Sequence, residues 1–157
     1  MTKVTKSIEI DASPEKVFAF IIDREKMNEA SKGFVEGEYT SKGPVGVGST
    51  LHFARKAGGS QIEWDYEITE FVNNKKVAMR TIGASKLKIV CSWILEPTAT
   101  GTKLTYSMDY EPPYSVLGKV VDKLKSSKDI EKSMEKQLGN IKKSLETQCL
   151  LQGDSVQ

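Results

Sequence analysis

The C-terminal stretch SVLGKVVDKLKSSKDIEKSMEKQLGNIKKSLETQC, residues 115–149, is central to the architecture, because no other segment is long enough to cover the strands before it. Its apolar residues recur at spacings of three and four, which predicts an amphipathic helix with one apolar stripe. The stripe has two sets of residues: Leu117, Val120, Val121 and Leu124, then Ile130, Met134, Leu138, Ile141 and Leu145. The second set is about a quarter-turn out of phase with the first, and the change falls at the polar residues 126–129.

We therefore expect either a bend at 126–129 or two successive helices. Length supports this expectation. A straight helix over 115–149 would be about 50 Å long, whereas a compact chain of this size is roughly 40 Å across.

The composition is that of one globular domain. The chain has 157 residues, 28% of them charged, and a net charge of +2. We expect a single domain over 1–149 with a polar tail at 150–157, and no binding to nucleic acid. The longest apolar run, residues 17–22, is too short to cross a membrane, so stable membrane insertion is not expected.

The N-terminus and the cysteines indicate the compartment. Residues 1–10 are too polar for a signal peptide. Cys91 and Cys149 lack the spacing of a disulfide framework and suit buried thiols in a reducing environment. Together these features predict a cytoplasmic protein.

Most of the chain before the long helix alternates between apolar and polar residues, which predicts strands. A first strand is expected over 4–10. Ser13 and Pro14 then begin a helix over 14–22, because serine caps a helix and proline fits its first position. Asp23 caps a second short helix over 24–30. About six further strands are expected, at 34–40, 50–56, 62–69, 77–82, 86–96 and 102–110.

This order of elements is an α+β pattern: a strand, two short helices, a run of antiparallel strands and a long helix. Long strands twist, so the sheet curls. If it curls around one long helix, its inner face cannot reach that helix everywhere. A cleft or cavity between sheet and helix is the expected result.

Three stretches, in this order and at this spacing, resemble a known family: IEIDASPEKVF at 8–18, GPVGVGS at 43–49, and WILEP at 93–97 followed by GTKLT at 101–105. Over residues 3–148 the chain is similar to the START-like, or SRPBCC, superfamily, and within it to the polyketide cyclase/dehydrase-like branch. The resemblance implies the helix-grip fold, a curved seven-stranded antiparallel sheet wrapped around the C-terminal helix with a hydrophobic cavity between them. The chain departs from the pattern at 27–30, MNEA, where many relatives carry tryptophan or proline.

The predicted inner face is rich in aromatic and sulfur-containing side chains. Tyrosine and tryptophan bring polar tips that a dry core would have to satisfy, and methionine suits an irregular wall. We interpret the set as the lining of a ligand cavity, with plain core packing as the alternative for any one residue. The predicted ligand-binding residues are Phe53, Arg55, Trp64, Tyr66, Met79, Trp93, Tyr106, Met108, Tyr110, Met134 and Leu138. Of these, Arg55 either binds a carboxylate or carbonyl or extends to solvent from its strand end.

Conventional catalytic and metal motifs are missing from the sequence. His52 is the sole histidine, alternates with apolar neighbours so that it points outward, and has no Gly-x-Ser-x-Gly partner. One histidine and two distant cysteines do not make a tetrahedral metal site. Glu63, Asp65 and Glu67 also alternate outward. We expect no metal and no cofactor, and the sequence identifies no catalytic residue.

Three functions remain open. The first is binding of a hydrophobic or amphipathic, lipid- or polyketide-like small molecule in the cavity. The second is a cyclase- or dehydratase-like lyase acting on a polyketide-like substrate, with Arg55 and a tyrosine such as Tyr106 as polar groups. The third is a chaperone-assisting interaction module, as the resemblance to another branch of the superfamily implies. The expected partner is an apolar small molecule, and the sequence indicates no particular protein partner.

Overall fold

The computed structural model describes residues 2–57, 59–83, 87–111 and 120–156, and in the last helix the side chains of residues 128–147. Its elements follow the predicted order. They are β1 (Thr2–Ile10), α1 (Pro14–Ile21), α2 (Arg24–Ala30), β2 (Glu36–Tyr39), β3 (Thr50–Ala57), β4 (Ser60–Val72), β5 (Lys76–Ile82), β6 (Lys88–Pro97), β7 (Thr102–Glu111) and α3 (Val120–Val156).

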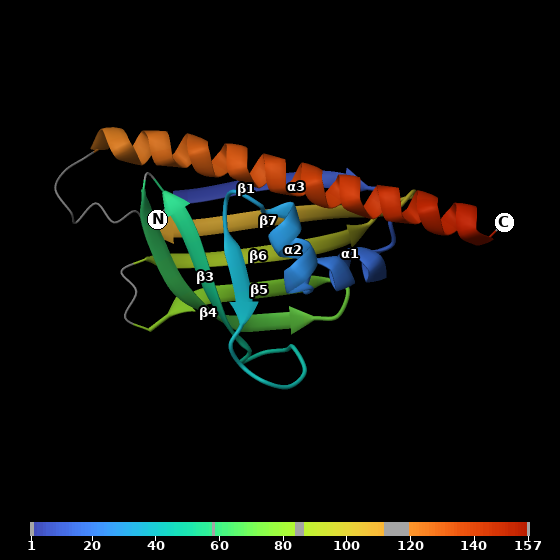
Figure 1. The fold of residues 1–157 in the computed structure, drawn as a ribbon, viewed down its shortest axis with the longest axis horizontal. Coiled ribbons are helices and arrows are strands. Elements are labelled where there is room, and N and C mark those ends of the chain that lie inside the picture. The colour runs from blue at the N-terminus through green and yellow to red at the C-terminus, as the bar shows by residue number, and fades with distance from the viewer. Residues whose placement is uncertain (1, 58, 84–86, 112–119, 157) are drawn as a thin grey trace.

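The strands form one seven-stranded antiparallel sheet in the order β1-β7-β6-β5-β4-β3-β2. The register between β4 and β5 shifts between Ile68 and Glu70, and a bulge of this kind increases the local bend and twist of a strand. Helix α3 packs along β1 and against α1 and α2, so that it lies across the sheet (Figure 1). The predicted α+β class and helix-grip fold are confirmed.

The prediction of two successive helices at the C-terminus is wrong. The structure has one helix over Val120–Val156, without a sharp bend in Figure 1. Residues 126–129 contain no glycine or proline, and serine costs only a few tenths of a kcal/mol relative to alanine inside a helix. The length conflict is resolved because α3 extends past the sheet at its C-terminal end (Figure 1), and residues 150–156, predicted as a tail, are helical.

The N-terminal half of the predicted stripe cannot be compared in full. Leu117 lies outside the described residues, as do the side chains of Val120, Val121 and Leu124. The second set is described, and its members Met134, Leu138, Ile141 and Leu145 are all buried.

The two short helices begin where the sequence predicts. Ser13 Oγ accepts a hydrogen bond from the Lys16 amide at 3.3 Å, and Asp23 Oδ1 accepts one from the Lys26 amide at 3.2 Å. Each cap satisfies an amide that has no partner within the helix. Both helices lie toward one end of the sheet, beneath α3 (Figure 1).

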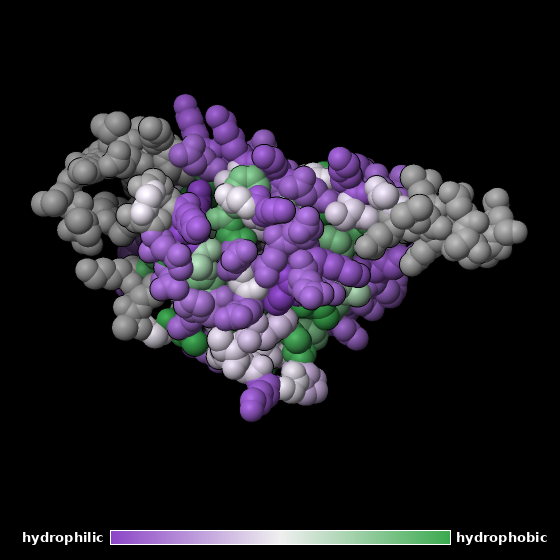
Figure 2. All heavy atoms as spheres, viewed as in Figure 1, coloured by the Kyte–Doolittle hydropathy of each residue, from purple (hydrophilic) through white to green (hydrophobic). Residues whose placement is uncertain are grey.

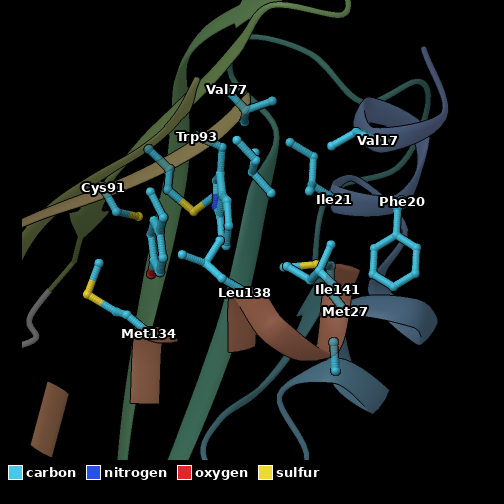
Figure 3. Close-up of a cluster of buried hydrophobic side chains, with 14 of the residues drawn as sticks. Val17, Phe20, Ile21, Met27, Val77, Cys91, Trp93, Met134, Leu138 and Ile141 are labelled. Atoms are coloured by element: carbon cyan, nitrogen blue, oxygen red, sulfur yellow. The ribbon is translucent and has the colours of Figure 1, made fainter. Parts of the chain in front are cut away.

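At this end the core is solidly packed. Val17 and Ile21 of α1 belong to the same buried cluster as Ile141 of α3, which is 0% exposed (Figure 3). The turn before β7 closes tightly on the same region, since Thr102 Oγ1 donates to the Ala12 carbonyl at 2.7 Å. A Cβ added to Gly101 would lie 2.1 Å from the Ile10 carbonyl oxygen, so this turn requires glycine.

Polar contacts hold α3 on the sheet and on α2. Lys142 Nζ donates to the Glu9 carbonyl at 2.7 Å, and Asn140 Nδ2 donates to the Ala30 carbonyl at 2.9 Å. Figure 2 shows the outer face over α3 and α2 as mostly hydrophilic, with smaller apolar areas between the polar side chains. The arrangement leaves the apolar stripe of α3 directed at the sheet.

Candidate ligand-binding cavity

A cavity of about 540 Å³ lies between the inner face of the sheet, α2 and the middle of α3. Strands β3 to β7 supply most of its wall, and α3 supplies Ile130, Met134 and Gln137. Exposed lining residues mark where it reaches the surface: Ile62, which is 39% exposed, and Asp129. The volume is within the range of small-molecule pockets, about 300–1,000 Å³.

The structure places every predicted site residue on this wall except Leu138. Leu138 is 2% exposed and lies beside Trp93 (Figure 3), one helical turn beyond Met134. It belongs to the packed end of the molecule, because the fully buried Ile141 follows it on the same stripe of α3. Ligand binding by the other residues remains a prediction.

Aromatic rings form a rigid section of the wall. Trp93 and Tyr106 are stacked with their centroids 3.9 Å apart and their planes 6° apart. Phe53 meets Tyr66 edge-on at 5.0 Å and stacks with Trp64 at 6.0 Å. Such pairs contribute about 0.5–1.5 kcal/mol beyond their burial, which favours this arrangement of the rings.

The wall also carries buried polar groups. Burial raises the pKa of the Tyr66 and Tyr106 hydroxyls well above their usual value, and it raises the pKa of the Cys91 thiol to about 12. All three groups are therefore neutral at physiological pH. Within the described part of the chain, Trp64 Nε1 and the Tyr110 hydroxyl are buried without a hydrogen-bond partner. From the sequence we expected such indole and hydroxyl groups to have hydrogen-bond partners, and in the described part of the chain these two have none.

Arg24 is a lining residue that the sequence reasoning missed. It is the first residue of α2, and its guanidinium lies 4.7 Å from the centre of the Phe53 ring. Its Nε donates to the Gly37 carbonyl at 3.2 Å, and Nη2 donates to Asn28 Oδ1 at 3.0 Å. A positive side chain at a helix N-terminus interacts unfavourably with the helix dipole. This unfavourable placement was the one feature of the sequence that could have indicated a role for Arg24 outside helix α2.

The connection between α2 and β2, together with β2 itself, supplies further lining that was not predicted. Phe34, Val35 and Tyr39 all face the cavity, and the Tyr39 hydroxyl donates to the Ile22 carbonyl at 2.8 Å. This segment has a strand of only four residues, too short for alternation to reveal its inner face. Arg55 is also on the wall, and is partly exposed.

The charged residues predicted to point outward do so. His52 Nδ1 lies 2.7 Å from Asp65 Oδ1, and His52 Nε2 lies 3.3 Å from Glu63 Oε1, on the solvent side of the sheet. The hydrogen bonds to Asp65 and then to Glu63 raise the pKa of His52. On the same face, Glu67 Oε2 lies 3.8 Å from Arg80 Nη2. These groups do not contribute to the cavity.

Two other kinds of feature are not found among the described residues. No group of three histidine, cysteine or acidic side chains there could hold a metal ion. Likewise, no helix in the described ranges is both long and apolar enough to cross a membrane.

The curved antiparallel sheet, two short helices and long C-terminal helix with a cavity between them define a START-like, helix-grip protein. A family described as polyketide cyclase / dehydrase and lipid transport matches residues 1–146. The chain belongs to this family.

Solved structures share the fold at low sequence identity. TTHA0849 from Thermus thermophilus superposes with a TM-score of 0.78 at 19% identity, covering 93% of this chain and 98% of that one. MLL2253 from Mesorhizobium loti gives 0.69 at 17% identity, covering 93% and 98%. The di-domain ARO/CYC BexL from the BE-7585A biosynthetic pathway gives 0.68 at 15% identity, and there the match covers 93% of this chain but 47% of the larger one. A search of curated proteins found no match.

Proposed function

We propose that the protein binds a hydrophobic or amphipathic small molecule, lipid- or polyketide-like, in the cavity between the sheet and α3. The observation that carries the proposal is the aromatic and aliphatic wall around about 540 Å³ of space. Membership of a family that includes lipid transport supports it. A cytoplasmic location and an apolar small molecule as partner remain predictions from the sequence.

Energetics supports the same proposal. A closed, empty apolar void costs about 24 cal/mol per Å³. For a cavity of 540 Å³ this would be about 13 kcal/mol, as much as the whole stability of a typical domain, about 5–15 kcal/mol. A space of this size is compatible with a stable fold because solvent or a ligand can occupy it.

The proposal can be tested with Nile red, a neutral dye whose emission rises in apolar surroundings. Met108 lines the cavity, and its neighbour Ser107 on β7 points to the other face of the sheet, where it hydrogen-bonds Thr5. Met108→Trp should fill the cavity and weaken dye binding at least tenfold, whereas Ser107→Trp, the matched control, should leave it within about twofold. Absence of saturable dye binding to the wild type, or equal effects of the two variants, would contradict the proposal.

Catalysis in the same cavity has less support. A cyclase or dehydratase needs a positioned acid or base. Among the described lining residues the carboxylates are Glu111, which lies 3.6 Å from Lys88, and Asp129, which is exposed. Loss of turnover in Arg55→Ala or Tyr106→Phe would favour the enzyme. The chaperone-assisting role also stays a prediction, which a pull-down insensitive to cavity substitutions would support.

A further inference from the structure

Hydrogen bonds hold the Arg24 side chain in one orientation on the cavity wall. Its Nε and Nη2 atoms donate to the Gly37 carbonyl and to Asn28 Oδ1. Asn28 is itself fixed, because its Nδ2 donates to the Gly37 carbonyl at 2.9 Å and its Oδ1 accepts from the Gly37 amide at 2.9 Å. These contacts hold the Asn28 side chain against the β2 backbone, so that its oxygen is in place to accept from Arg24.

Gly37 makes room for this arrangement. A Cβ at position 37 would lie 2.8 Å from Arg24 Nη2 and 2.8 Å from the Phe53 ring. The Arg24 guanidinium therefore packs closely against the β2 backbone and against the Phe53 ring, whose centre is 4.7 Å from it. An arginine this closely confined has already lost the rotational freedom that a surface arginine would lose on binding a ligand.

Among the described residues, the positive charge of Arg24 has no ion-pair partner. Its two hydrogen-bond acceptors are a carbonyl and an amide oxygen, both neutral. Across the residues that the structure describes, no carboxylate lies within ion-pairing distance, 4.0 Å, of the guanidinium. The neighbouring Asp23 instead caps α2 through the Lys26 amide. Burial has the largest influence on the pKa of Arg24 and lowers it, while the charge of Asp23 acts in the opposite direction.

The guanidinium also has donors to spare. A guanidinium has five N–H groups in a planar fork that matches a carboxylate. Within the described part of the chain, the hydrogen bonds to Gly37 and Asn28 use one at Nε and one at Nη2, which leaves both Nη1 donors and the second on Nη2 for a ligand.

We propose that the cavity takes an amphipathic acid, with its carboxylate bound by Arg24 and its apolar body against the aromatic wall. This inference rests on the proposed function and narrows it to one class of ligand. The competing explanation is that Arg24 only joins α2 to β2. The two explanations differ in one measurable respect, since only the first makes affinity depend on the charge of the ligand's head group.

The experiment compares dodecanoate, methyl dodecanoate and dodecanol as competitors of Nile red at pH 7.5. The wild type should bind dodecanoate about tenfold to a hundredfold more tightly than the two neutral probes, the range expected for charge-assisted hydrogen bonds. Arg24→Gln should abolish this preference, so that dodecanoate and dodecanol compete with equal affinity in the variant, whatever change the substitution causes in the affinity for neutral probes. Lys26→Gln removes the same charge from the exposed side of α2 and serves as the matched control, in which the preference should persist.

Additional variants distinguish the two explanations even if Arg24→Gln does not fold. If Arg24→Gln fails to fold, the ratio of acid to alcohol affinity in the wild type and in Arg24→Lys still decides, and Arg24→Lys should keep part of the preference. Equal affinity of the wild type for acid, ester and alcohol would overturn this inference alone. So would a preference that survives in Arg24→Gln or that disappears in Arg55→Gln instead. Failure of every probe and of Nile red to bind would overturn both this inference and the proposed function.

Discussion

Met134 and Leu138 lie on successive turns of the same apolar stripe of α3, and each is 2% exposed, yet only Met134 lines the cavity. Leu138→Ala removes atoms from the packed end of the molecule and leaves a closed void. Truncations of this kind cost about 2–5 kcal/mol, and we expect about 3–4 here. The space left by Met134→Ala instead joins the existing cavity. The void term is then small, and mainly the transfer term remains, about 1–2 kcal/mol.

Urea unfolding of the two variants, followed by circular dichroism, measures the difference. The midpoint should fall more for Leu138→Ala than for Met134→Ala with the slope unchanged, and each kcal/mol should lower the melting temperature by about 2–4 °C. A loss for Met134→Ala equal to or greater than the loss for Leu138→Ala would refute the conclusion that the cavity ends between these two residues.

The other predictions concern the turn before β7, the middle of α3 and the outer face. Gly101→Ala should cost about 3 kcal/mol or more, because its Cβ would lie 2.1 Å from the Ile10 carbonyl oxygen; a normal yield and an unchanged urea midpoint would contradict this. Gly139→Ala should raise stability by about 0.5–1 kcal/mol, because outside the neighbouring backbone of α3 no atom lies within 4 Å of the added methyl group; a lowered midpoint would count against the packing of α3 as described. Asp65 and then Glu63 raise the pKa of His52 in the folded protein. The contribution of protonated His52 to folding stability is therefore complete below the unfolded pKa of about 6.5, and it disappears as the pH rises through the folded pKa. The urea midpoint of the wild type relative to His52→Gln should therefore be greater at pH 6 than at pH 9 in low salt, and the reverse order would refute this assignment.

The strands were predictable because each is long enough for alternation to show which residues share a face. Residues 62–69 are an example: Trp64 and Tyr66 are buried, and Glu63 and Asp65 are less so, on the solvent side. The ends of the short helices were predictable from Ser13 and Asp23, because capping depends on residues near in sequence. Strand alternation and the spacing along α3 correctly predicted ten residues of the cavity wall, but other lining residues such as Arg24 and Phe34 were not predicted.

The continuity of α3 was not predictable in the same way. The change of phase at 126–129 indicates a break only if every apolar residue must be buried against the sheet. The structure keeps one helix through this change of phase, so the two sets of apolar residues need not face one surface. Local preferences at serine and lysine are too weak to end a helix that tertiary packing continues.

Arg24 shows a second limit of the sequence. Its position depends on Gly37 and Phe53, which come from two different strands and reach Arg24 only after the sheet has formed. No periodicity within α2 reports on those contacts. The only local signal is the unfavourable placement of a cation at a helix N-terminus, and that signal indicates an unusual residue without identifying its partners.

One end of the molecule is closely packed and mainly supports folding stability, whereas the other end contains the cavity. At one end, α1 and the Leu138, Ile141 and Leu145 segment of α3 form a closed core. At the other end, Ile130 and Met134 of the same helix face a cavity. A hollow sheet would be unstable alone, so the solid end must supply the packing that the cavity end lacks. Substitutions in the cavity wall should therefore alter ligand selectivity at modest cost in stability, whereas those in the closed core should mainly change stability.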